Sequence, residues 1–261
     1  MQLNHARILL TGASGGLGQA LARQLAAAGA KLLLAGREPD RLAELSKELG
    51  PGHANVCADL TRPEGIAATA GAAREFKINV LVNNAGIGGF GLYDHQTWSD
   101  IDAVLATNLT APMRITHALL PWLQAQPQAA IVNIGSTFGS IPFAGFAAYS
   151  SAKAGLRGFS QALRRELADS EIAVIHLAPR AIATPLNSDA VNALNRALKN
   201  QCDSAESVAA KVVAALQRGD RETHIGFPER LFAWINGVAP TLIDRGLADK
   251  LAVIKQHASP R

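Results

Sequence analysis

The sequence has very little cysteine. Its 261 residues include only Cys57 and Cys202, which form no CxxC spacing. This pattern gives no basis for a disulfide framework or a zinc site, and we assign no metal ligands. Since proteins without disulfides are typical of reducing compartments, we expect a cytoplasmic location.

Clustered charge and long hydrophobic runs are also absent. The 25 basic and 21 acidic residues are scattered, so the formal net charge of +4 marks no nucleic-acid surface and fits an anionic small ligand equally well. Residues 115–152 lack Asp, Glu, Lys and Arg, but proline, glycine and glutamine divide them into short segments. This stretch predicts buried soluble protein rather than a transmembrane span. The first seven residues contain no apolar core, so no signal peptide is expected.

What the chain does contain is an alternation of short apolar segments and longer amphipathic ones. This order predicts strands joined by helical crossovers, and hence a mostly parallel sheet with helices on both faces. The expected strands are Ile8–Leu10, Lys31–Ala35, Asn55–Asp59, Val80–Asn83, Ala130–Ile134, Ile172–Leu177 and Thr223–Phe227. We therefore expect an α/β fold: a single Rossmann-type, doubly wound domain of about seven strands over residues 1–227, with ligands at the carboxyl ends of the strands.

Residues 228–261 follow a different pattern. They include no expected strand, and their apolar side chains recur at near-helical intervals. These side chains are Leu231, Phe232, Trp234, Ile235 and Val238. The pattern predicts a C-terminal helical extension that packs on the domain or on a partner subunit. A segment that covers the substrate or touches a membrane is the alternative.

A glycine-rich segment, Thr11–Gly18, lies between the first strand and an expected helix at Gln19–Ala28. Glycines remove the Cβ atoms that keep a ligand away from the backbone, and the free amides of a helix N-terminus attract a pyrophosphate. The spacing is Gly-x-x-x-Gly-x-Gly, which differs from the general Gly-x-Gly-x-x-Gly dinucleotide motif. The segment indicates a phosphate-binding turn, with a tight structural turn as the alternative.

Arg37 follows the second expected strand directly after Gly36. An acidic residue is expected near this point when the ligand is the ribose 2′-hydroxyl of NAD(H), whereas a guanidinium suits the 2′-phosphate of NADP(H). Arg37 therefore favours NADP(H) over NAD(H). The alternative is a surface arginine at the end of a strand, because the glycine segment supplies no second basic residue.

Tyr149 and Lys153 lie four residues apart in an expected helix, so their side chains lie on one face of it. A cation beside a phenol favours the phenolate and makes tyrosine a better proton carrier at neutral pH. Ser136 follows the strand Ala130–Ile134 at the same edge of the sheet, where its hydroxyl suits a substrate carbonyl or a turn. Asn108 interrupts a long helical pattern and either bends the helix or faces solvent.

From about Arg7 to Phe227, these features together resemble the short-chain dehydrogenase/reductase family. Thr11–Gly18 matches the family's cofactor turn, Asp59-Leu60 its adenine-side contact, and Asn83-Asn84-Ala85-Gly86 its signature at the fourth strand. Its catalytic tetrad is matched by Asn108, Ser136, Tyr149 and Lys153. The cofactor-binding residues that the resemblance implies are Gly12, Ser14, Gly16, Leu17, Gly18, Arg37, Asp59, Leu60, Asn84, Ala85, Gly86, Tyr149, Lys153, Pro179, Ile182 and Thr184.

The resemblance implies an enzyme that transfers hydride between C4 of the nicotinamide and a carbonyl or carbinol carbon. Tyr149 would transfer the proton, and Ser136 would polarise the substrate oxygen. Lys153 would hold the nicotinamide ribose and lower the pKa of the tyrosine. Asn108 would anchor a water that leads protons towards Lys153.

Two departures from the family pattern concern a loop and the C-terminus. Arg180 follows Pro179, where relatives usually have glycine ahead of the threonine, here Thr184. Arg180 is expected to reshape the nicotinamide-side loop, to contact an anionic substrate group, or to face solvent. The C-terminus lacks the glycine-rich ending of relatives that form compact tetramers, so we do not carry that assembly over, and a homodimer remains compatible with the sequence.

Apolar residues surround the expected reacting end of the cofactor. They are Phe90, Leu92, Tyr93, Phe138, Ile141, Phe143, Phe146 and Leu186, with ordinary core packing as the alternative interpretation. They favour a small hydrophobic ketone, aldehyde or secondary alcohol, with lipid-like or aromatic carbonyls preferred over sugars. The sequence thus predicts an NADP(H)-dependent oxidoreductase. The alternatives are an NAD(H)-dependent alcohol dehydrogenase and a non-catalytic module that senses NADP(H).

Overall fold

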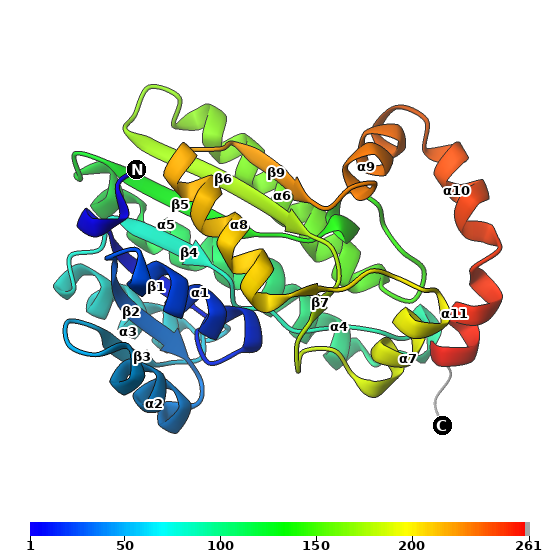
Figure 1. Ribbon diagram of the computed structural model, residues 1–261, viewed down its shortest axis with the longest axis horizontal. Coiled ribbons are helices and arrows are strands. Elements are labelled where there is room, and N and C mark those ends of the chain that lie inside the picture. Colours follow the sequence, from blue (N-terminus) through cyan, green and yellow to red (C-terminus); the bar gives the residue numbers. More distant parts are fainter. Residues whose placement is uncertain (259–261) are drawn as a thin grey trace.

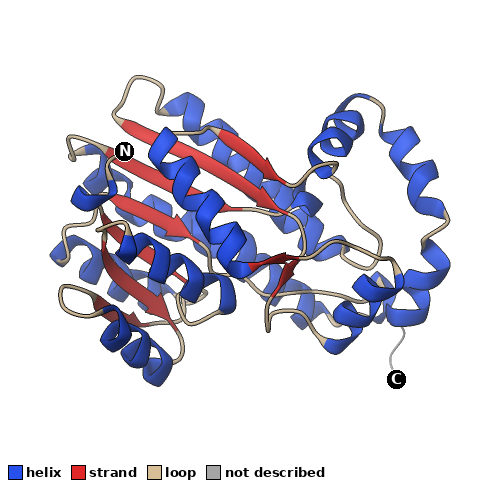
Figure 2. Cartoon of the chain, viewed as in Figure 1, coloured by secondary structure: helices blue, strands red, loops and turns tan. Residues whose placement is uncertain are grey.

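Seven parallel strands form the central sheet of residues 1–258, the part of the chain that the computed structural model describes (Figure 1, Figure 2). The strands are β1 (Arg7–Thr11), β2 (Lys31–Gly36), β3 (Ala54–Cys57), β4 (Val80–Asn83), β5 (Ala129–Ile134), β6 (Ile172–Pro179) and β9 (Glu222–Ile225). Their order across the sheet is β3-β2-β1-β4-β5-β6-β9. The order reverses between β1 and β4, which is where doubly wound sheets bind ligands. The expected Rossmann-type fold is confirmed.

Helices cover both faces of this sheet (Figure 1). They are α1 (Gly16–Ala27), α2 (Pro39–Leu49), α3 (Pro63–Glu75), α4 (Trp98–Leu105), α5 (Ala111–Gln124), α6 (Ala147–Glu166), α7 (Asp189–Ala197) and α8 (Ala205–Arg218). Alternation along β1 explains the two layers, because Ile8 and Leu10 pack towards α1 and α8, whereas Leu9 packs towards α3 and α5. Both faces of the strands are therefore buried, as the continuous apolar segments predict.

Three local features differ from the expectation. The helix α1 begins at Gly16, three residues before the expected start, and the last strand ends at Ile225 rather than Phe227. Gly226 ends that strand with a φ of 131°, a conformation that favours glycine. Two unpredicted strands, β7 (Ile182–Ala183) and β8 (Asp203–Ser204), pair in a small second sheet. Strands of two residues are too short to show a periodic pattern, so no signal in the sequence predicts them.

Residues after β9 form three helices: α9 (Glu229–Val238), α10 (Pro240–Ala248) and α11 (Leu251–Ala258). Figure 1 shows them as an arch that leaves the sheet beside β9 and returns beside α7. No side chain of α9 or α10 is buried, whereas Ile254 of α11 packs against Phe146 and Leu194. The expected helical extension is thus present. No helix within residues 1–258 has both the length and the apolar character needed to span a membrane.

Candidate active site

The glycine segment is tied to the chain that follows β4. Thr11 accepts hydrogen bonds at Oγ1 from the backbone N–H groups of Asn84 and Ala85, both at 3.0 Å. The Asn84 amide in turn donates to the carbonyls of Thr11, at 2.9 Å, and Gly12, at 3.2 Å. A Cβ at Gly12, where φ is +64°, would lie 2.7 Å from the Cα of Ala85. Only glycine fits at this position. Its small size lets the glycine segment lie against the chain that follows β4.

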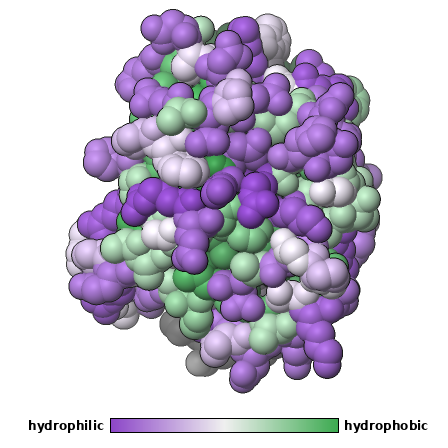
Figure 3. All heavy atoms as spheres, turned by 90° about the vertical axis from the view of Figure 1, so that its left-hand side faces the viewer, coloured by the Kyte–Doolittle hydropathy of each residue, from purple (hydrophilic) through white to green (hydrophobic). Residues whose placement is uncertain are grey.

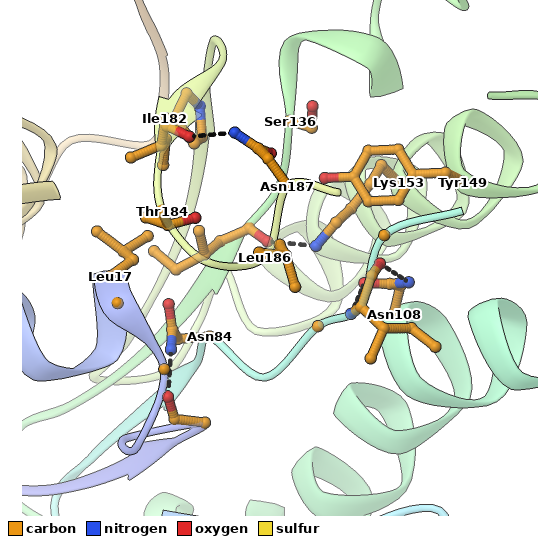
Figure 4. Close-up of a pocket in the computed structure, with 18 of the residues that line it drawn as sticks. Leu17, Asn84, Asn108, Ser136, Tyr149, Lys153, Ile182, Thr184, Leu186 and Asn187 are labelled. Carbon is orange, nitrogen blue, oxygen red and sulfur yellow. Dashed lines mark hydrogen bonds between the residues drawn. The ribbon is translucent and has the colours of Figure 1, made fainter. Parts of the chain in front are cut away.

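One cleft of about 1130 Å³ runs along the carboxyl ends of the strands. Every residue that the sequence assigns to the catalytic tetrad or to cofactor binding lines it. Of the expected substrate residues, Phe138, Ile141, Phe143, Phe146 and Leu186 also line it. Figure 4 shows side chains from several elements converging on this space, including Tyr149 and Lys153 from α6.

The expectation for Phe90, Leu92 and Tyr93 is wrong, since none of them lines the cleft. Phe90 packs against Phe146 instead, with ring centroids 4.9 Å apart, so it belongs to the core. Tyr93 is 57% exposed. The backbone N–H of Gly91 donates to the carbonyl of Gly145, and this bond holds the segment against the chain before α6.

Two arginines line one end of the cleft, near the carboxyl end of β2. Arg37 is exposed, and Arg41, in the first turns of α2, lies four residues beyond it. Arg41 pairs with Glu38 at 3.1 Å, and Glu38 also accepts a hydrogen bond from Ser14 at 3.5 Å. Sequence reasoning missed Arg41 because it looked for a second cation only in the glycine segment. The signal available was the spacing of four residues from Arg37.

Asp59 lies at the same end of the cleft, after β3. Its Oδ1 accepts hydrogen bonds from the backbone N–H of Thr61, at 2.9 Å, and from the Thr61 hydroxyl, at 2.8 Å. These bonds hold the pKa of Asp59 below its ordinary value. The carboxylate is thus fixed and charged at neutral pH.

Asn108 is fully buried in a π-helical turn, Ala106–Thr110, between α4 and α5. Its amide donates to the carbonyls of Ile87 and Val104, both at 3.0 Å, and its Oδ1 accepts from the N–H of Ile87 at 3.2 Å. Pro112 has no N–H to give to the carbonyl four residues earlier, which is that of Asn108 itself. Of the two expected arrangements, the break in the helix is therefore the one found.

Tyr149 and Lys153 project from α6 into the cleft (Figure 4). Lys153 is 5% exposed, and its ammonium donates to the carbonyl of Ile134 at 3.0 Å. Burial lowers the pKa of Lys153 to about 8. Burial also raises the pKa of Tyr149, whereas hydrogen bonding to Ser136 lowers it. The expected lowering by Lys153 is not among these causes, because its ammonium lies 5.8 Å from the centre of the tyrosine ring and is directed to Ile134.

The loop after β6 crosses the cleft towards the glycine segment. A Cβ at Gly16 would lie 3.0 Å from the Cβ of Thr184, so the two segments are in close contact. Arg180, in the same loop, donates to Asp203 at 2.7 Å and to Gln201 at 2.6 Å, and it pairs with Glu229 at 3.5 Å. Its guanidinium therefore ties this loop to β8 and α9. Of the three expectations for Arg180, the structure supports the reshaped loop.

Part of the cleft wall comes from α7, which the sequence did not assign to the site, and from α9 and α10, for which a segment that covers the substrate was the alternative expectation. The apolar lining residues missed are Val191 and Leu194 of α7, Phe232 of α9, and Leu242, Ile243 and Leu247 of α10. The near-helical spacing of apolar residues after residue 228 was the available signal. It predicts a helix but does not say which face meets the cleft.

Comparisons with known proteins agree on one family. The family model described as short chain dehydrogenase matches residues 6–195. Dehydrogenase/reductase SDR family member 7B from Bos taurus is 33% identical over 270 aligned positions, which cover 95% of this chain and 82% of the relative. The 3-oxoacyl-[acyl-carrier-protein] reductase FabG from Vibrio cholerae is 37% identical over 200 positions, 75% of this chain and 79% of the relative.

Solved structures show the same similarity. A short-chain dehydrogenase from Sphingobium yanoikuyae in complex with NADPH is 30% identical, has a TM-score of 0.79, and matches over 92% of this chain and 95% of its own. A short chain dehydrogenase/reductase from Burkholderia phymatum in complex with NAD has a TM-score of 0.84 and 22% identity over 93% of this chain and 96% of its own. The second likeness shows the fold alone.

Proposed function

The chain belongs to the short-chain dehydrogenase/reductase family, and from that premise we propose that it is an NADP(H)-dependent oxidoreductase. The proposed reaction passes hydride between the nicotinamide and a carbonyl or secondary alcohol of a small hydrophobic substrate, with Tyr149 as general acid or base. The observation that carries the proposal is the meeting of Asn108, Ser136, Tyr149 and Lys153 in one cleft with the glycine turn.

The lining residues fit a dinucleotide. Because Gly12 has no Cβ, its backbone lies close to that of Ala85. The N-terminus of α1 offers free amides to a pyrophosphate. Arg37 and Arg41 supply positive charge for a 2′-phosphate, which supports NADP(H). Because the similar solved structures include complexes with NADPH and with NAD, the cofactor preference rests on these arginines.

When bound, the nicotinamide supplies or accepts the hydride. In reduction, Tyr149 donates its hydroxyl proton to the substrate oxygen while Ser136 donates a hydrogen bond to the same atom. Burial raises the pKa of Tyr149 and keeps the phenol protonated, whereas the hydrogen bond with Ser136 lowers that pKa towards the range in which proton transfer at neutral pH is efficient. Lys153 would hold the nicotinamide ribose, and Asn108 holds the backbone at Ile87 in place.

The proposal includes a cytoplasmic location and a homodimer. Both cysteines are unpaired and exposed, which suits a reducing compartment. Large apolar side chains are exposed on the outer helices, which supports a contact with a second copy.

Titration with NADPH and NADH, followed by nicotinamide fluorescence, tests the cofactor. We expect tighter binding of NADPH, and in Arg37→Ala a loss of about ten- to a hundredfold for NADPH with little change for NADH, because charge-assisted hydrogen bonds are worth about 1.5–3 kcal/mol. Arg62→Ala, an exposed arginine outside the cleft, is the matched control. Equal binding of NADH by the unaltered protein would instead favour the NAD(H)-dependent alcohol dehydrogenase.

A Tyr149→Phe variant completes the test, with turnover measured over a panel of ketones and aldehydes. It should bind NADPH as the unaltered protein does and lose turnover by about a hundredfold or more, the usual contribution of general acid–base catalysis. Cofactor binding with no turnover of the panel by either protein would favour the non-catalytic sensor module.

A further inference from the structure

The helix α10 presents one face to the cleft without burying any side chain. Ile243, Gly246, Leu247 and Lys250 all line the cleft. Ile243, Gly246 and Leu247, at spacings of three and four residues, lie on one face of α10, and Lys250 follows in the turn between α10 and α11. An apolar helix face that meets open space gains stability only when something apolar fills that space.

The opposite wall of this part of the cleft is mixed. Leu186 follows the loop that crosses the cleft, Val191 and Leu194 come from α7, and Asn187 and Asn195 lie beside them in the sequence. Phe232 of α9 also lines the cleft. The cleft that contains Tyr149 therefore includes apolar side chains of α7, α9 and α10, and it is larger than a compact ketone requires.

Lys250 lies in the turn just after α10, lines the cleft and is half-buried. Among residues 1–258, no carboxylate lies within ion-pairing distance of its ammonium. Arg180, the other cation on this side of the cleft, is already paired with Asp203 and Glu229. This side of the cleft thus carries one uncompensated positive charge.

We propose that the space beneath α10 is a subsite for the apolar chain of an amphiphilic substrate, whose anionic end binds Lys250. The inference rests on the proposed function, because it places the reacting carbonyl at Tyr149 and the chain beneath α10. The substrate class is a long-chain oxo- or hydroxy-carboxylate, with the reacting group separated from the carboxylate by methylene groups.

Chain length is the first test, with NADPH oxidation measured for methyl ketones from butanone to tetradecanone. We expect kcat/KM to rise by about two- to fourfold per methylene while the chain extends beneath α10, the factor for moving one methylene out of water. Leu247→Ser should flatten this rise. Val238→Ser, an exposed apolar residue outside the cleft, is the matched control and should keep the rise.

Charge recognition is the second test, measured without turnover by calorimetric titration with dodecanoate and dodecanol. Lys250→Gln should weaken dodecanoate by about three- to tenfold and leave dodecanol unchanged. Arg245→Gln removes a charge of α10 that lies outside the cleft, and it should change the binding of neither dodecanoate nor dodecanol. Dodecanoate that binds no better than dodecanol would overturn the role of Lys250.

The outcomes separate this inference from the proposed function. If butanone and tetradecanone are reduced equally well and Leu247→Ser has no effect, the enzyme stands and the subsite is rejected. If no ketone is reduced but dodecanoate binds in a manner that depends on Lys250 and Leu247, the subsite stands and the proposed reaction is rejected.

Discussion

Lys153 holds a charge where burial opposes it. Its pKa is lowered from 10.5 to about 8, which corresponds to roughly 3 kcal/mol of unfavourable free energy for the charged form. One hydrogen bond, to the carbonyl of Ile134, offsets about 1 kcal/mol of this cost. Stability alone therefore does not explain a lysine at this position, and residues that lower stability are typical of functional sites.

We expect Lys153→Met to raise the free energy of unfolding by about 2 kcal/mol at pH 7, since it removes a buried charge and keeps the volume. The gain should be greatest below pH 8, where the lysine is charged in both folded and unfolded chains. It should shrink between pH 8 and pH 10.5, because the folded lysine loses its proton first.

Urea unfolding at several pH values, together with ketone turnover, measures both effects. Turnover should fall at least a hundredfold in this more stable variant. Two results would contradict the proposed destabilisation by the buried charge of Lys153. One is a variant less stable than the unaltered protein at pH 7, and the other is a gain in stability that is the same at every pH.

The tetrad is assigned from the resemblance to the family, because the residues alone place Tyr149 and Lys153 on one helix face and Ser136 after a strand but give Asn108 no spacing that marks it. Arg41 was missed because a second cation was sought only in the glycine segment, although Arg41 follows Arg37 by four residues. The partners of Arg180 were beyond prediction for a different reason: Asp203 and Glu229 lie 23 and 49 positions further along the chain. No local pattern links residues that only the tertiary fold brings together.

At the scale of elements, the seven strands of the sheet were predictable because buried parallel strands are continuous apolar segments. The break between α4 and α5 was harder to predict, since a proline such as Pro112 fits the first turn of an ordinary α-helix as well as a π-helical bend. The small pair β7 and β8 depends on contacts across the loop after β6, and Arg180 is the residue that holds those elements and α9 together.

We expect Arg180→Ala to lower the free energy of unfolding by about 3 kcal/mol, because it removes the cation paired with Glu229 and leaves Asp203 with the more distant Lys211, at 3.8 Å, in a largely buried place. Arg180 lowers the pKa of Asp203, so the pair stabilises the fold above the unfolded value of 3.8. This stabilisation is lost as the pH falls through the folded pKa, and the difference from the variant should then disappear.

Arg218→Ala is the matched control, since that arginine pairs with Asp220 while 60% exposed and should contribute less than about 1 kcal/mol. Hydrogen exchange adds a local measurement: amides of α9 should exchange faster in Arg180→Ala and unchanged in Arg218→Ala. Equal losses of stability in the two variants would mean that Arg180 does not act as a buried clamp.

At the scale of the whole molecule, polar and apolar surface are unevenly distributed. The face viewed in Figure 3 carries mostly hydrophilic side chains with apolar ones interspersed. The outer side of α9 is different, because Phe227, Leu231, Trp234 and Val238 are between 45% and 77% exposed. Their spacing of four, three and four residues gives one apolar stripe along the helix and the residues before it. The stripe lies beside β9, the edge strand of the sheet.

An isologous homodimer that pairs this stripe with its copy would bury these side chains and cover the edge of the sheet. We expect sedimentation velocity to show a dimer, and Trp234→Lys to weaken it by at least about thirtyfold, since a central tryptophan contributes about 2 kcal/mol or more. Trp98→Lys, which changes an equally exposed tryptophan on α4, should remain a dimer. Loss of the dimer in Trp98→Lys alone would place the interface on α4 instead, and a monomer in every case would reject the assembly. Cofactor binding should be unchanged in both variants, because neither tryptophan lines the cleft.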